Sequence, residues 1–268
     1  MRDLLKTDLR RLIKDKLFLV VCILGAVFAV FSPLLYKVLF GALEVEDMLG
    51  MTVNAKTLFF SAFSLGSNFG FIVPILISII ICKDFSQGTI RNKIISGQSR
   101  TKVFISMLIA SSIVICCVIL VHGILTLCTS LLFFPYQATA FSWADFGYLL
   151  LSVVFEILVY VFVSTLVCLL CVGMKNTGLA VVMYAAVNFL FTIIGSIFAA
   201  ALMFSDPQSS AYPILQFFDK INLFTSTIIG GGSTYLFKDV LYILLPTVGG
   251  SALFILFGIS IFKKKDLK

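Results

Sequence analysis

The hydrophobic residues of this chain are grouped into long uninterrupted runs. A helix needs about 20 apolar residues to cross the roughly 30 Å hydrocarbon core of a bilayer. Six runs reach that length, at about residues 17–40, 58–82, 103–134, 146–172, 178–204 and 240–262. They are continuous rather than alternating, which argues against a transmembrane β-barrel. The pattern predicts an all-α polytopic membrane protein with six transmembrane helices.

The composition agrees with this prediction. Hydrophobic residues make up 60% of the chain and charged residues only 12%, whereas a soluble domain carries about a quarter charged residues. This excludes a soluble globular enzyme and a disordered chain. The segments between the runs are too short for a soluble catalytic domain, so we expect no enzymatic activity from this chain by itself.

The basic residues indicate the orientation of the spans. Sixteen of the 20 Lys and Arg lie in segments that six spans would place on one side: Arg2, Lys6, Arg10, Arg11, Lys14, Lys16, Lys83, Arg91, Lys93, Arg100, Lys102, Lys175, Lys263, Lys264, Lys265 and Lys268. Because basic loops stay in the cytoplasm, both termini are predicted to be cytoplasmic. Topology thus accounts for the net charge of +7, and we expect no nucleic-acid partner.

The segment before the first run predicts an amphipathic helix over residues 1–16. Leu4, Leu5, Leu9, Leu12 and Ile13 recur at helical spacing, with charged residues on the other face. Such a helix lies on the membrane surface, in contact with lipid, before the chain enters the bilayer.

The most polar stretch of the chain is Lys83 to Lys102 (KDFSQGTIRNKIISGQSRTK). Asp84 can cap a following helix, and Gly88 interrupts the chain near the middle of the stretch. Ile90, Ile94 and Ile95 predict an apolar helix face, with Arg91, Asn92 and Lys93 directed elsewhere. The pattern fits a short helix that docks another protein, and equally a solvated basic loop that only fixes topology.

This stretch resembles the ABC-2 type permeases, the transmembrane subunits of ATP-binding cassette exporters. The resemblance rests on Asp84, on Gly88-Thr89-Ile90-Arg91 and on Ser96-Gly97-Gln98-Ser99-Arg100. The family more often has Glu at the acidic position and Pro where Gly97 stands. In that family the stretch is a coupling helix in a cleft of the partner ATPase. The resemblance implies that the coupling residues are Asp84, Phe85, Gln87, Gly88, Thr89, Ile90, Arg91, Asn92 and Lys93.

The resemblance extends over a single domain, residues 1–268, in the bacterial cytoplasmic membrane. No GxxxxGK[ST] phosphate loop occurs, so the resemblance implies a separate ATP-binding subunit that carries ATP and magnesium, with no cofactor in this chain. Six spans are half the usual complement, so we expect a second permease chain, identical or homologous. The cargo would be hydrophobic or amphipathic, such as a peptide or an antibiotic. The alternative is a standalone secondary transporter or channel.

Residues 206–239 contain the apolar patches YPILQFF and INLFTSTIIGGG, each too short to span a bilayer. The resemblance implies a re-entrant segment on the outer side, with a turn at Gly230, Gly231 and Gly232. The alternative is an amphiphilic surface loop.

Three polar residues inside the runs are candidates for a translocation path: Glu156, His122 and Asn188. A charged group near the bilayer centre costs about 2.5 kcal/mol or more. Glu156 could therefore contact a cationic substrate, pair with a group across the dimer, or be a protonated carboxyl bonded to a neighbouring helix. A lone membrane histidine is more often an interhelical hydrogen-bonding residue. Cys168 and Cys171 form a CxxC inside a span, which favours packing, and we expect no metal site.

Overall fold

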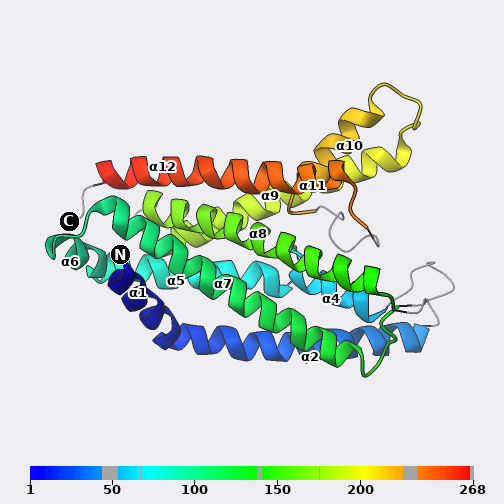
Figure 1. Ribbon diagram of the computed structural model, residues 1–268, viewed down its shortest axis with the longest axis horizontal. Coiled ribbons are helices and arrows are strands. Elements are labelled where there is room, and N and C mark those ends of the chain that lie inside the picture. The colour runs from blue at the N-terminus through cyan, green and yellow to red at the C-terminus, as the bar shows by residue number, and fades with distance from the viewer. Residues whose placement is uncertain (44–53, 67, 138–140, 175, 226–233, 266–268) are drawn as a thin grey trace.

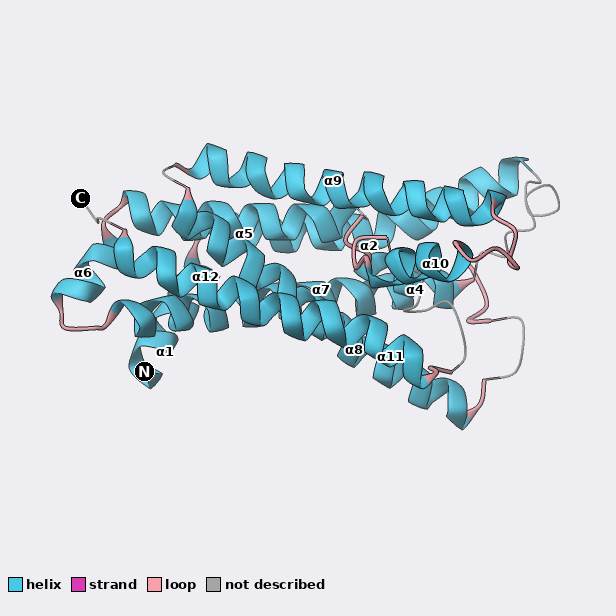
Figure 2. Cartoon of the chain, turned by 90° about the horizontal axis from the view of Figure 1, so that it is seen from above, coloured by secondary structure: helices cyan, strands magenta, loops and turns pink. Residues whose placement is uncertain are grey.

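The computed structural model describes residues 1–43, 54–66, 68–137, 141–174, 176–225 and 234–265, and the structural statements below refer to these residues. Every regular element in them is helical (Figure 2). The elements are α1 (Arg2–Lys14), α2 (Lys16–Leu43), α4 (Ala55–Phe63), α5 (Asn68–Ser86), α6 (Thr89–Ile95), α7 (Arg100–Ser130), α8 (Trp143–Gly173), α9 (Thr177–Phe204), α10 (Tyr212–Ile221), α11 (Phe237–Leu244), a π-helical turn (Leu245–Gly249) and α12 (Gly250–Lys264).

Six helices are long and apolar enough to cross a membrane, which confirms the prediction of an all-α multi-pass protein. They cover Lys16–Leu39, Phe69–Ser86, Arg100–Ser130, Trp143–Gly173, Thr177–Phe204 and Phe237–Lys264. Polar side chains begin several of them, as the N-cap residues Ser99 of α7, Ser142 of α8 and Asn176 of α9 show. These caps satisfy backbone N–H groups that would otherwise lack acceptors at the start of each helix.

The long helices lie side by side in one elongated bundle (Figure 1). In α7 and α8, 67% of the most apolar stretch is buried, against 11% in α9 and in the last span, so α7 and α8 form the centre. Helices α1, α6 and the end of α12 gather at one end of the bundle, and α10 lies at the other. We call these the α6 end and the α10 end.

The second apolar run differs from its prediction as one helix over 58–82. It forms two helices, because α4 ends at Phe63 and residues 64–66 are not helical before α5. Two side chains from other helices stabilise this break. The hydroxyl of Tyr160 donates to the carbonyl of Phe63 at 2.7 Å, and the amide of Asn188 donates to the carbonyl of Leu65 at 3.4 Å. A helix can be interrupted at membrane depth when such groups satisfy the freed backbone.

The segment that follows α9, which was predicted to lie on the outer side and is called the outer segment below, packs back onto α9. Asn222, just after α10, donates from its side-chain amide to the carbonyl of Phe191 at 2.7 Å, and Phe224 stacks on the Phe191 ring with centroids 5.4 Å apart. Gly195 makes room for this contact, because a Cβ there would meet Thr225 and Asn222. The turn predicted at Gly230, Gly231 and Gly232 lies outside the described residues.

Candidate functional site

Helix α1 presents its apolar face to the protein rather than to the surroundings. Leu12 is buried, and Leu4, Leu5 and Leu9 pack against the same core, where α1 meets α7. Asp8 lies on this buried side and is 3% exposed. The amphipathic helix predicted over residues 1–16 therefore exists as α1, with its leucines packed against the bundle, whereas Ile13 of the predicted apolar face is exposed.

The predicted coupling stretch forms a helix–turn–helix at the α6 end. Gly88, which lies between α5 and α6, has a φ of +72°. Gly97, which lies between α6 and α7, has a φ of +91°. These left-handed conformations favour glycine. The expectation that Asp84 caps the following helix is wrong: α5 continues to Ser86, so Asp84 lies inside it, and Gly88 occupies the N-cap position of α6.

Three ion pairs join α1 to this stretch. Arg11 pairs with Asp84 and Lys93 pairs with Asp8, while Lys83 Nζ lies 3.0 Å from Asp15 Oδ2. Asp8 also accepts a hydrogen bond of 2.6 Å from the hydroxyl of Ser106 on α7. Because Asp8 and Asp84 are both buried, removal of either cationic partner would leave a buried charge without compensation. We call Asp8, Arg11, Asp84 and Lys93 the α1–α6 cluster.

The environment of the pairs shifts two pKa values. Burial lowers the pKa of Arg11, and the nearby Asp8 and Asp15 partly oppose this. Burial would raise the pKa of Asp15, but the Leu17 N–H and the Lys83 ammonium outweigh it, so the pKa of Asp15 is lowered. Asp15 is thus held as a carboxylate, and it joins α1 to α2 by accepting the Leu17 N–H at 3.0 Å.

One face of helix α6 packs against the protein, and the opposite face is exposed. Ile90 is 2% exposed and Ile94 packs against the core, whereas Ile95 is 71% exposed. Arg91 and Asn92 are exposed as well. The predicted apolar face is therefore correct for Ile90 and Ile94 and wrong for Ile95, which lies one turn from Arg91 on the outward surface. Lys93 was predicted to lie away from the apolar face, but its side chain is directed toward the protein, where it forms an ion pair with Asp8.

The remaining coupling residues flank α6. The Phe85 ring packs edge-on against the ring of Phe262 on α12, with centroids 6.1 Å apart. Lys265 Nζ lies 4.9 Å from the centre of the Phe85 ring. Gln87 is exposed, and Gly88 and Thr89 are half-buried. The same Lys265 donates to the carbonyls of Val172 and Met174 at the end of α8. The end of α12 is therefore bound to the end of α5 and to the end of α8.

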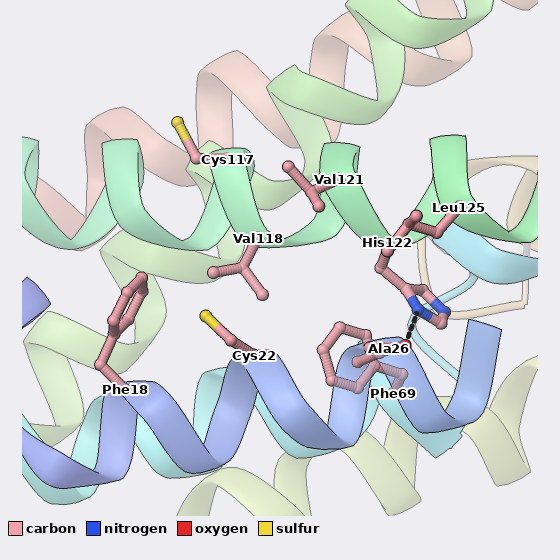
Figure 3. Close-up of a pocket in the computed structure, with 10 residues that line it drawn as sticks. Phe18, Cys22, Ala26, Phe69, Cys117, Val118, Val121, His122 and Leu125 are labelled. Carbon is pink, nitrogen blue, oxygen red and sulfur yellow. Dashed lines mark hydrogen bonds between the residues drawn. The ribbon is translucent and has the colours of Figure 1, made fainter. Parts of the chain in front are cut away.

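The three candidate translocation-path residues do not share one site. Asn188 belongs to the helix break. His122 donates from Nδ1 to the carbonyl of Gly25 on α2 at 3.0 Å, beside an apolar cavity of about 150 Å³ between α2 and α7 (Figure 3). His122 thus makes the interhelical hydrogen bond that is usual for a lone membrane histidine.

Glu156 is the one candidate without a hydrogen bond or ion pair to the described part of the chain, and it is 7% exposed. It lies on a buried face of α8 with Tyr148, Ser152 and Tyr160 at spacings of four residues. Ser152 Oγ is 2.6 Å from the hydroxyl of Tyr235, so polar groups continue from Glu156 toward the α10 end. Four-residue spacing of polar side chains in the sequence could have indicated this face.

Sequence reasoning missed the partners of the coupling stretch, Asp8, Arg11 and Asp15. A signal existed for Asp8, because it lies on the leucine side of the predicted helix, where an acid is costly without a partner. Among the described residues, no group of three or more His, Cys, Asp or Glu side chains is arranged to hold a metal ion.

The six apolar helices define a multi-pass α-helical membrane protein. Residues 17–268 match a protein family described as "Protein of unknown function (DUF2705)". The chain therefore belongs to the DUF2705 family. A comparison with curated proteins gives no match.

Proposed function

We propose that this chain is the permease subunit of an ATP-driven exporter in the bacterial cytoplasmic membrane, with the α6 end in the cytoplasm. The observation that carries the proposal is the geometry of α6. It is a short helix between two spans, fixed on one side by Ile90 and Lys93, while Arg91 and Ile95 remain exposed. A loop that only fixes topology needs neither a defined helix nor buried ion pairs.

The separate subunit would be an ATP-binding cassette ATPase that binds the exposed face of α6 and carries ATP and magnesium. Movement of the ATPase would displace α6 and the end of α5. The ion pairs of Lys93 on α6 and of Lys83 and Asp84 on α5 would pass this displacement to α1 and to Asp15. Since α1 is joined to α2 through Asp15, the first span would move with it. The outer segment 206–239 would act as a re-entrant closure, because Asn222 and Phe224 already pack on α9.

A second permease chain, identical or homologous, would complete the pathway. Helix α9 supports this pairing because its exposed side borders a groove of about 300 Å³, where Thr192, Ser196 and Ala200 alternate with the larger Phe189, Ile193 and Ile197. Small residues at such spacing let two membrane helices approach closely. The cargo would be hydrophobic or amphipathic, such as a peptide or an antibiotic, exported between the two chains.

The test is to purify the tagged chain from its native membrane and identify bound proteins by mass spectrometry. We expect an ATP-binding cassette subunit to copurify and to hydrolyse ATP. Replacement of Gly88-Thr89-Ile90-Arg91 by alanines should lower hydrolysis or binding. Substrate transport by the chain without any ATPase would instead identify a standalone secondary transporter or channel and overturn the proposal.

A further inference from the structure

The outward face of α1 carries a line of four basic residues. Arg2, Lys6, Arg10 and Lys14 follow one another at intervals of four residues, and all four are exposed. Side chains at this spacing lie above one another on one side of a helix. None of the four forms an ion pair with the described part of the chain. We call these four residues the α1 basic stripe.

The acidic residues of α1 do not neutralise this stripe. Asp8 is buried on the opposite side of the helix and pairs with Lys93, and Asp15, just after the helix, pairs with Lys83. Asp3 is the only exposed acid on α1. The charges are therefore largely separated: Asp8 and Asp15 bind the protein, and the four basic residues of the stripe, with Asp3 as the single exposed acid beside them, present a net positive charge to the surroundings.

The position of α1 places this charge at the edge of the bilayer. Only Asp15 separates α1 from α2, and both helices pack against α7, so both turn their outer faces away from it (Figure 1). On α2 the outer face begins with Leu19, Ile23 and Val27, each more than half exposed. These apolar side chains match the hydrocarbon, so the stripe lies where the hydrocarbon gives way to lipid headgroups.

We propose that the α1 basic stripe binds the phosphate groups of anionic phospholipids in the adjacent leaflet. Basic residues near an anionic membrane surface each contribute about 1 kcal/mol of binding free energy. The charge of the stripe, its spacing and its place beside the lipid-facing surface of α2 fit phospholipid headgroups. The bound lipids would hold the outer face of α1, whose inner face carries the α1–α6 cluster.

The test uses the full chain, purified in a neutral detergent and titrated with phosphatidylglycerol or phosphatidylcholine of equal acyl chains. Bound lipid is counted by native mass spectrometry. The test variant is Lys6→Gln with Arg10→Gln, in the middle of the stripe. The matched control is Lys263→Gln with Lys264→Gln, which removes two exposed charges from the end of α12. Both variants should unfold at the wild-type temperature, because none of these side chains is buried.

We expect the wild-type chain to prefer phosphatidylglycerol, and this preference to weaken as salt is added. The stripe variant should bind it at least about fivefold more weakly, the equivalent of one lost charge contact. The control should stay within about twofold of the wild type. An equal loss in both variants, or no preference between the lipids, would overturn the proposal.

A second outcome would also overturn it. If the stripe variant bound phosphatidylglycerol normally but lost a copurifying protein subunit, the stripe would be a surface for an acidic protein. The lipid titration needs only this chain, so its result is independent of whether an ATPase partner exists.

Discussion

Lys93 of α6 is ion-paired with Asp8 of α1, 85 residues earlier in the chain. The two side chains are 13% and 3% exposed, and the Ser106 hydroxyl from α7 also donates to Asp8. Water therefore screens this pair little. The pair fixes the orientation of α6, so that Ile90 faces inward and Ile95 faces outward. A helix held in this way can transmit a displacement instead of absorbing it.

Removal of one partner of this pair should be costly. Asp8→Asn leaves the largely buried Lys93 ammonium without its carboxylate, and we expect the free energy of unfolding to fall by about 3 kcal/mol. The double variant with Lys93→Gln should lose less than the sum of the two single variants. Chemical denaturation in detergent measures all three. Strict additivity of the two losses would contradict a direct interaction between Asp8 and Lys93.

The ion pair at Asp15 predicts a dependence on pH. The pKa of Asp15 is lowered in the folded chain from its ordinary value of 3.8. Its stabilising effect is therefore fully present above that value and is lost as the pH falls through the lowered pKa. Asp15→Asn keeps the acceptor for the Leu17 N–H and removes the charge. The difference in unfolding free energy between wild type and Asp15→Asn should stay constant above the ordinary value of 3.8 and shrink as the pH falls below it. A difference that stayed constant throughout would contradict the assignment.

The helix break should depend on its two donors. Tyr160→Phe removes the hydroxyl that donates to the carbonyl of Phe63, and we expect a loss of about 1 kcal/mol or more in stability. The control is Tyr212→Phe, because the Tyr212 hydroxyl is not hydrogen-bonded to the described residues and the side chain is half-buried on α10. Thermal unfolding in detergent compares them. Equal midpoints for the two variants would show that the break does not need Tyr160.

Two helical glycines should respond in opposite ways to alanine. At Gly195 a Cβ would collide with Thr225 and Asn222, so Gly195→Ala should displace the outer segment and lower the unfolding temperature. At Gly147 on α8 a Cβ meets open space. Gly147→Ala should be neutral or stabilising by up to about 1 kcal/mol, because alanine favours helix. A stabilised Gly195→Ala variant would argue against close packing of the outer segment on α9.

The sequence predicted the number of spans well because hydrophobic length is a local property. Six apolar runs gave six apolar helices, and Gly88 marked the start of α6. The break between α4 and α5 was not predictable in this way, since its stabilising donors, Tyr160 and Asn188, come from distant helices. Its own residues carry only a weak local signal, because Ser64 and Gly66 are poor helix formers but flank a single leucine within a long apolar run.

The candidate site shows the same limit. Spacing identified the short helix α6 and its buried Ile90, but it assigned Ile95 to the wrong face and Asp84 to a cap. Both errors come from long-range ion pairs. The pair between Lys93 and Asp8 sets the orientation of α6, and Asp84 pairs with Arg11 instead of capping a helix. Pairings across 70 or more residues leave no periodic signal in the sequence.

The most direct test of the central proposal is the amount of ATP-binding subunit that copurifies with the chain after one change on the free face of α6. Arg91→Glu reverses an exposed charge there, and Lys263→Glu, exposed at the end of α12, is the control. We predict that the wild type and Lys263→Glu retain the subunit and that Arg91→Glu loses most of it. A wild-type chain without any ATP-binding subunit, or full retention by Arg91→Glu, would contradict α6 as the coupling helix.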